Sequence, residues 1–349
     1  MDSLTQAVLG AGVTAAVLGP RIGPRKAAAL GAVLGSLPDL DVFWPFDDPV
    51  EAFVLHRSAS HSLLMHAVVT PVLAEAVMRM FRDLRRERGR SWLAVYLALS
   101  THALLDALTI YGTQLFWPLS ARPFGTGSVF IIDPLYTIPL LVVTVWALCI
   151  RAWTGGFERG LTAALLVSTG YLGWGLVGQQ IATQRAEAVM AARGIEPSHV
   201  IATAAPFNTL FWRVIAVDDD RYLNVYVPIL GGAADVTVYE HPRLPNGDVE
   251  MLKILSGIKA AGTLMAFSKG FWRAERDGVA VVVADLRMGL TPAYVFRFAV
   301  AEALAVGMVS VAPRRVPLER TAEGDIDWLL AGIAGTRAVR PAEATRLID

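Results

Sequence analysis

Six apolar stretches fill most of the first 181 residues, and they limit the possible folds more than any other property of this sequence. They cover residues 4–18, 27–37, 62–80, 92–111, 130–150 and 160–181. Because an α-helix needs about 20 residues to cross a bilayer, we expect the last four to span a membrane and the first two to form a short packed hairpin. The chain is 54% hydrophobic and only 18% charged, which is typical of membrane proteins.

Beyond residue 181 the pattern changes to short β-rich runs separated by turn residues. The predicted elements are strands over residues 211–217, 222–230, 279–286 and 294–298, and a helix over 249–260. The sequence therefore predicts a membrane α-helical bundle of about six apolar helices over residues 1–181, followed by a soluble α+β domain over residues 182–349.

Basic residues gather in every second connection between the apolar stretches. They are Arg21, Arg25 and Lys26, then six arginines between residues 79 and 90, then Arg151 and Arg159. The positive-inside rule places these connections in the cytoplasm. We therefore expect a multi-pass protein of the inner (plasma) membrane with an extracytoplasmic C-terminal domain. The alternative is a soluble helical protein with a basic face, but the uncharged run over residues 160–184 argues against it.

His102 and Asp106 lie four residues apart within one apolar stretch. On a helix this spacing aims both side chains at one point, and polar groups at bilayer depth cost several kcal/mol unless something satisfies them. A metal ion would satisfy both side chains. The alternative is a neutral histidine hydrogen-bonded to the aspartate.

Further residues of metal-ligand type lie at matching depth. Asp39 and Asp41 follow Pro38 at the end of the second stretch, and His56 and His61 precede the third. Imidazole and carboxylate ligands without thiolates suit zinc, manganese or iron. The lone cysteine, Cys149, excludes a cysteine-based zinc site. We therefore expect one or two divalent metal ions.

Within this set, Arg57 is the predicted contact for a substrate anion, because a guanidinium is always charged and forks onto phosphate. Asp41 or Asp106 is the predicted base for a metal-activated water. The alternative for Asp39 and Asp41 is a solvated turn at a helix end. His66 is expected to be a core residue or to support the ligands.

Together these motifs resemble the YdjM-type family of inner-membrane, metal-dependent hydrolases. The motifs are MDSLTQA at residues 1–7, GSLPDLD at 35–41, HR at 56–57 with SHSL at 60–63, and TH at 101–102 with Asp106. The segments APFN at 205–208 and DLRMG at 285–289 are similar to the C-terminal region of longer members. The main resemblance covers residues 1–150.

That family is usually placed near the zinc-dependent phospholipase C and single-strand nuclease superfamily, which has a helical fold and His, Asp and His-x-x-x-Asp zinc ligands. The resemblance implies metal roles for Asp39, His56, His61, His102 and Asp106, and it makes zinc the expected metal. No second His-x-x-x-Glu/Asp pair follows Asp106, so a three-metal cluster is not expected.

Our first functional hypothesis is a membrane-bound metal-dependent hydrolase of a phosphoester or lipid-linked substrate, with membrane lipid as its partner. The alternative is a non-catalytic membrane protein that uses a structural metal and presents its C-terminal domain to a partner. Metal or ion transport is a third hypothesis, since intramembrane His and Asp can line a pathway. The formal net charge of zero predicts no nucleic-acid partner, and no oligomeric state is predicted.

Overall fold

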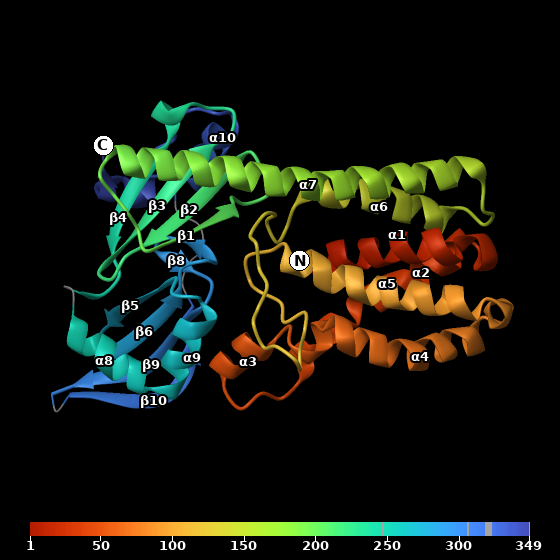
Figure 1. The fold of residues 1–349 in the computed structure, drawn as a ribbon, viewed down its shortest axis with the longest axis horizontal. Helices are drawn as coiled ribbons and strands as arrows, with labels where there is room; N and C mark the ends of the chain where they lie inside the picture. The colour runs from red at the N-terminus through yellow and green to blue at the C-terminus, as the bar shows by residue number, and fades with distance from the viewer. Residues whose placement is uncertain (246–247, 306, 318–322, 349) are drawn as a thin grey trace. The chain divides into compact units, whose positions relative to one another are not determined.

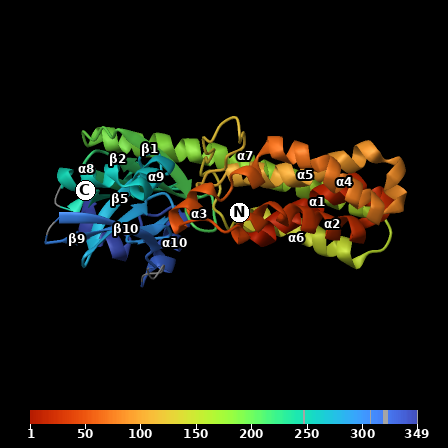
Figure 2. The ribbon, with the colours of Figure 1, turned by 90° about the horizontal axis from the view of Figure 1, so that it is seen from below.

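The computed structural model describes residues 1–245, 248–305, 307–317 and 323–348, and it divides into two compact units (Figures 1 and 2). The helical unit contains Met1–Trp44 and His56–Leu176, and the sheet unit contains Pro45–Leu55 and Val177–Asp349. The predicted boundary between residues 181 and 182 falls inside the long helix α7 (Gly155–Ala192).

Helices form over each of the six predicted apolar stretches. They are α1 (Ser3–Ile22), α2 (Pro24–Ser36), α4 (Leu63–Met80), α5 (Arg88–Ala107), α6 (Pro134–Cys149) and α7. Short 3₁₀ turns lie between them: η1 (Pro38–Phe43), η2 (Ala59–His61) and η3 (Arg82–Arg86).

Among the described residues, three helices are long and apolar enough to cross a membrane: α1, α4 and α7. The prediction that the first stretch is too short is wrong, because Asp2 caps α1 at Thr5 and the helix continues through Pro20 to Ile22. Two expected spans are missing from this set. Helix α6 is apolar but has only 16 residues, and α5 carries arginines in its first turn.

Helices α1 and α2 pack with their backbones in contact. A Cβ placed on Gly10 would lie 2.3 Å from the carbonyl oxygen of Gly31, and one on Gly35 would lie 2.6 Å from that of Gln6. Only glycine allows such an approach, as in the small-residue contacts of membrane helices. This packing holds one face of α1 against the C-terminal half of α2.

The three basic connections meet at one end of the helical unit, where the α1–α2, α4–α5 and α6–α7 turns lie together (Figure 1). Arg21 Nε lies 2.9 Å from Glu87 Oε1, which joins the first connection to the second. Arg25 Nε donates to the carbonyl oxygen of Leu148 at 2.8 Å, which joins the first to the third.

The sheet unit contains two antiparallel sheets. The strand order is β1-β2-β3-β4-β11 in the first sheet and β10-β9-β6-β5 in the second. Strands β7 and β8 pair separately as a small hairpin that lies between β6 and β9 in the sequence. The strands are β1 (His199–Ala204), β2 (Phe211–Val217), β3 (Arg221–Pro228), β4 (Thr237–Pro242), β5 (Trp272–Asp277), β6 (Ala280–Asp285), β7 (Gly289–Leu290), β8 (Ala293–Tyr294), β9 (Arg297–Leu304), β10 (Gly307–Arg315) and β11 (Leu347–Ile348). The strands predicted over residues 211–217 and 222–230 are confirmed by β2 and β3, which pair antiparallel.

Helices α8 (Val249–Gly257), α9 (Lys259–Phe267) and α10 (Asp325–Ile333) accompany these sheets, together with η4 (Ala233–Asp235) and η6 (Pro341–Arg346). The helix predicted over 249–260 ends early, because Ile258 is extended (φ −89°, ψ 116°) and a separate helix begins after it.

Helix α3 (Pro49–Leu55) belongs to the sheet unit as part of the segment Pro45–Leu55, although the chain up to Trp44 and from His56 onward belongs to the helical unit. Its Phe53 is buried, with its ring centroid 4.0 Å from that of Phe296 and 5.0 Å from that of Phe267. The chain thus leaves the helical unit after η1, contributes one helix to the sheet unit, and returns before η2.

A buried polar network stabilises the sheet unit around Glu343 of η6. Its carboxylate accepts hydrogen bonds from Tyr226 at 2.6 Å, His241 at 2.8 Å and Arg340 at 3.0 Å. Burial alone would raise the pKa of Glu343, but the contacts with His241, Tyr226 and Arg340 outweigh it and lower the pKa to about 2. The carboxylate is therefore charged at neutral pH.

Candidate metal centre

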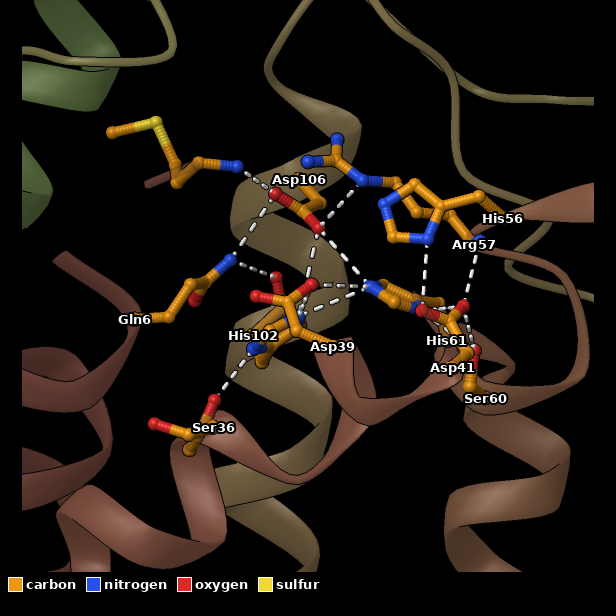
Figure 3. A network of polar contacts seen from close by, with 12 residues as sticks. Gln6, Ser36, Asp39, Asp41, His56, Arg57, Ser60, His61, His102 and Asp106 are labelled. Atoms are coloured by element: carbon orange, nitrogen blue, oxygen red, sulfur yellow. Dashed lines mark hydrogen bonds and ion pairs between the residues drawn. The ribbon is translucent and has the colours of Figure 1, made fainter. Parts of the chain in front are cut away.

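Four potential ligands converge in the helical unit at the ends of helices away from the basic connections. Asp39 comes from η1, His61 from η2, and His102 and Asp106 from α5 (Figure 3). One ligand atom from each lies within 4.8 Å of all the others. The structure thus brings together four of the five predicted metal ligands.

Local structure explains why these side chains meet. Pro38 stands at the first position of η1, where α2 ends and Asp39 follows. Ser62 caps α4 and donates to the carbonyl oxygen of Trp117 at 2.6 Å. This bond fixes His61 just ahead of the helix. Helix α5 supplies the remaining pair one turn apart, as the i, i+4 spacing predicts.

Hydrogen bonds fix the tautomer of both histidines. The Nδ1 of His102 lies 2.6 Å from the carbonyl oxygen of Gly35, which can only accept, so Nδ1 carries the hydrogen. Ser60 Oγ donates its hydrogen to Asp41 at 2.7 Å and therefore accepts from His61 Nδ1 at 2.9 Å. Both neutral rings then direct the lone pair of Nε2 toward the centre, as metal-ligating histidines do.

The distances between the converging atoms fit tetrahedral coordination. The His61 Nε2 atom lies 3.1 Å from His102 Nε2, 3.2 Å from Asp106 Oδ2 and 3.4 Å from Asp39 Oδ1. The His102 Nε2 atom lies 3.5 Å from both carboxylate oxygens. Ligands 2.0–2.1 Å from a tetrahedral zinc ion are about 3.3 Å apart, so the five measured separations match this geometry.

Asp106 gives a second test of the fit. Its Oδ2 atom is buried and accepts no hydrogen bond among the described residues. The oxygen has an ion pair with Arg57 Nε at 3.2 Å but no hydrogen bond among these residues, and a buried carboxylate oxygen that is not fully satisfied is costly. Together with two imidazole lone pairs, this acceptor-only set suits a divalent cation. Asp39 is the most exposed of the four, with 21% of its side chain accessible.

The carboxylates of Asp106 and Asp39 also change the pKa of His61. Burial alone would lower the pKa of His61, but the carboxylates of Asp106 and Asp39 outweigh burial and raise it. Burial would raise the pKa of Asp39, but the imidazoles of His102 and His61 hold it far below its usual range. Metal binding must therefore compete with a proton on His61.

Asp41 and His56 form a separate pair beside the four ligands. Asp41 Oδ1 lies 2.8 Å from His56 Nδ1, and Oδ2 accepts from the main-chain N–H of Arg57 at 3.0 Å and from Ser60. Burial opposes ionisation of Asp41, but the contacts with His56 outweigh it and lower the pKa. The ring centroid of His56 is 5.8 Å from that of His61, and His56 lies outside the four-residue group.

Arg57 is held tightly at the edge of the centre. Its backbone is left-handed (φ 67°), which is uncommon for a residue with a side chain. Its Nε lies 3.2 Å from Asp106 Oδ2, and its guanidinium carbon lies 4.8 Å from the centre of the Tyr111 ring. The guanidinium therefore faces the metal-ligand group.

Gln6 of α1 supports the ligands and was not assigned a role from the sequence. Its Nε2 donates to Asp106 Oδ1 at 3.1 Å and to the main-chain oxygen of His102 at 3.3 Å. The main-chain nitrogen of Met1 also contacts Asp106 Oδ1. The sequence signal for such a role was an amide side chain within an apolar stretch.

Two other polar residues lie apart from the ligands. His66 is buried in α4, and its Nε2 donates to the carbonyl oxygen of Ser60 at 2.8 Å. Asp133 caps α6 at Leu135 and accepts a hydrogen bond from Tyr171 at 2.8 Å.

Comparison with known proteins identifies the family to which this centre belongs. The sequence model of YdjM inner membrane proteins matches residues 1–182, which include all four converging ligands. The chain belongs to the YdjM family. Inner membrane protein YbcI of Escherichia coli (strain K12) is 33% identical over 130 residues, which is 35% of this chain and 73% of that relative. No solved structure matches significantly. The YdjM match makes this an inner membrane protein.

Proposed function

We propose that this chain is a membrane-embedded hydrolase that uses one zinc ion, bound by Asp39, His61, His102 and Asp106, to cleave a phosphoester or related lipid-linked bond. The observation that carries the proposal is the near-tetrahedral set of acceptor atoms with separations of 3.1–3.5 Å. The sequence also suggested a second ion, but His56 and Asp41 are hydrogen-bonded to each other.

When bound, the ion would supply Lewis acidity toward an ester oxygen and would lower the pKa of a water molecule. Arg57 would bind the substrate anion, since its guanidinium faces the centre. His56, oriented by Asp41 through Nδ1, would accept a proton at Nε2, as in other carboxylate-oriented histidines. In the hydrolysis, water oxygen bonds to phosphorus, the ester P–O bond breaks, and the departing alkoxide gains a proton.

The alternative is a structural metal in a non-catalytic protein. It is favoured by the count of ligands, because four protein ligands can close a tetrahedral zinc site. Catalysis requires an open position, and Asp39 is the ligand that can provide one, since its side chain is 21% exposed whereas those of His61, His102 and Asp106 are buried.

We also propose that the six helices α1, α2 and α4 to α7 form the membrane unit, with the C-terminal domain outside the cytoplasm. Support comes from the basic connections, which meet at one end of the unit through Arg21 and Arg25. The positive-inside rule makes that end cytoplasmic. A reporter fused after Gln184 should be extracytoplasmic and one inserted at residues 82–90 cytoplasmic. The opposite pattern would refute this orientation.

Turnover by the purified full-length protein tests the hydrolase proposal. Zinc-loaded protein in detergent is assayed against a panel of soluble and lipid phosphoesters, alongside Asp106→Asn and the control Cys149→Ser. We expect turnover by the wild type and by Cys149→Ser, and a loss of at least a hundredfold in Asp106→Asn, whose ligand oxygen is lost. Stoichiometric zinc that raises the melting temperature without turnover of any ester would favour the structural alternative.

A further inference from the structure

A groove opens on one face of α4 within the helical unit. Its volume is about 460 Å³, within the range of small-molecule sites. Its walls are aliphatic, with Val69 and Leu73 from α4, Leu99 from α5 and Leu37 at the end of α2. Such a lining binds hydrocarbon and offers nothing to a charged ligand.

Two of the residues that line the groove are chain neighbours of proposed metal ligands. Pro38 and Ser60 line it, and the next residues in the chain, Asp39 and His61, are two of the four proposed ligands. Consecutive residues are only about 3.8 Å apart. The groove therefore lies beside the two chain segments that carry Asp39 and His61.

His66 adds to the lining of the groove a polar atom without a hydrogen-bond partner within the described ranges. The residue is only 3% exposed and lines the groove. Its Nε2 donates to the carbonyl oxygen of Ser60, so the neutral ring carries a lone pair on Nδ1. This buried Nδ1 has no hydrogen-bond partner among the described residues. It suits a ligand with a hydroxyl or amide donor at that level.

The outer wall of the groove belongs to a membrane-spanning candidate. Val68 and Val72 of α4 line it and are 66% and 71% exposed. From His66 to Leu73 the helix rises about 10 Å. In a bilayer this wall would face the hydrocarbon, so an acyl chain could enter sideways from the lipid phase.

We propose that the groove binds one acyl chain of a membrane lipid phosphoester, with the phosphate at the metal centre and a free hydroxyl of the linker donating to His66 Nδ1. The inference rests on the proposed function and names its substrate class. A single-chain lipid such as a monoacylglycerol phosphate has all three features: one chain, a free hydroxyl and an adjacent phosphate.

Photo-crosslinking tests the groove without requiring turnover. The probe is a monoacylglycerol phosphate with a diazirine in its acyl chain, added to full-length protein in phosphatidylcholine nanodiscs with zinc. We expect labelling to concentrate on residues 66–73 and to be displaced by unlabelled monoacylglycerol phosphate. The 2-deoxy analogue should displace it about threefold to tenfold less well, because it lacks the donor to His66.

Two variants that fill the groove have a matched control elsewhere. Val69→Trp and Val72→Trp should each lower displaceable labelling at least tenfold while the zinc content stays unchanged. Val142→Trp replaces a valine of α6 that is 58% exposed and does not line the groove, so it should label like the wild type. Equal labelling along α4 and α6, or labelling that neither groove variant reduces, would overturn the proposal.

Turnover separates a failure of the groove from a failure of the hydrolase proposal. In the groove variants, hydrolysis of the acylated ester should fall at least tenfold while that of p-nitrophenyl phosphate is unchanged. If both esters are hydrolysed equally well by Val69→Trp and the wild type, the groove assignment is wrong and the hydrolase stands. If no ester is hydrolysed but labelling is displaced and lost in Val69→Trp, the groove stands without the hydrolase.

Discussion

Replacing Gly10 with alanine should damage both the fold and the metal centre. The new Cβ would lie 2.3 Å from the carbonyl oxygen of Gly31 and 2.8 Å from the Cα of Gly35, where ordinary contacts begin at 3.4 Å. Both obstacles are main-chain atoms, so α1 and α2 must move apart. Gln6 and Gly35, which hold Asp106 and His102, would move with these helices.

The expected magnitudes follow from these contacts. Overpacking of this kind costs about 1–3 kcal/mol of stability, and displaced supporting hydrogen bonds weaken metal binding about tenfold to a hundredfold. Gly12→Ala is the matched control two residues along the same helix. Its Cβ would lie 3.5 Å from Leu165 Cδ2, an ordinary contact, so Gly12→Ala should be neutral or stabilise the helix by about 0.5–1 kcal/mol.

The assay is unfolding of the full-length protein in mixed detergent micelles, together with competition for zinc against a chelator. We expect Gly10→Ala to lose both stability and zinc affinity and Gly12→Ala to lose neither. Equal behaviour of the two variants would refute the packing argument. A destabilised Gly10→Ala with unchanged zinc affinity would show that α1 and α2 do not support the ligands.

Three further predictions concern other parts of the chain. Arg57→Ala should retain zinc but lose a few kcal/mol of transition-state stabilisation, measured as reduced turnover. Arg57→Lys should restore turnover only partly, because lysine lacks the two-pronged guanidinium. Full rescue by lysine would contradict a bidentate contact with the substrate anion. Glu343, whose pKa falls from 4.5 to about 2 on folding, should stabilise the sheet unit above pH 4.5, and this contribution, on the order of 3 kcal/mol, should be lost as pH falls toward 2. Hydrogen exchange of β3 and β4 in the full-length protein should show that loss, and Glu343→Gln should abolish the pH dependence over that interval. Phe53→Ala should destabilise the sheet unit by about 3–5 kcal/mol, since the ring is buried; hydrogen exchange in β9 and β10 unchanged from the wild type would contradict this packing.

The sequence predicted those features that depend on local spacing. The pair His102 and Asp106 followed from one helical turn, and the candidate span α4 followed from its hydropathy. By contrast, the first apolar stretch is shorter than α1, because the apolar pattern stops before Pro20 and Arg21. The helix nevertheless includes both residues and ends at Ile22. A hydropathy pattern does not reveal how a capped helix ends.

Features that depend on distant contacts were not predictable from the sequence. Gln6 of α1 meets Asp106 of α5 across 100 positions of sequence. His56 was assigned to the metal, but the loop places its Nδ1 on Asp41, and its role as a ligand remains a prediction. Phe53 packs with aromatic rings more than 200 residues away in sequence, a contact for which local periodicity gives no signal.

X-ray absorption spectroscopy of the zinc-loaded full-length protein tests the four-ligand centre most directly. We predict one tightly bound zinc ion with a first shell of only nitrogen and oxygen at about 2.0–2.1 Å, and outer-shell scattering from two imidazoles, those of His61 and His102. A sulfur ligand at about 2.3 Å, a shell without imidazole, or failure to bind stoichiometric zinc would contradict this prediction.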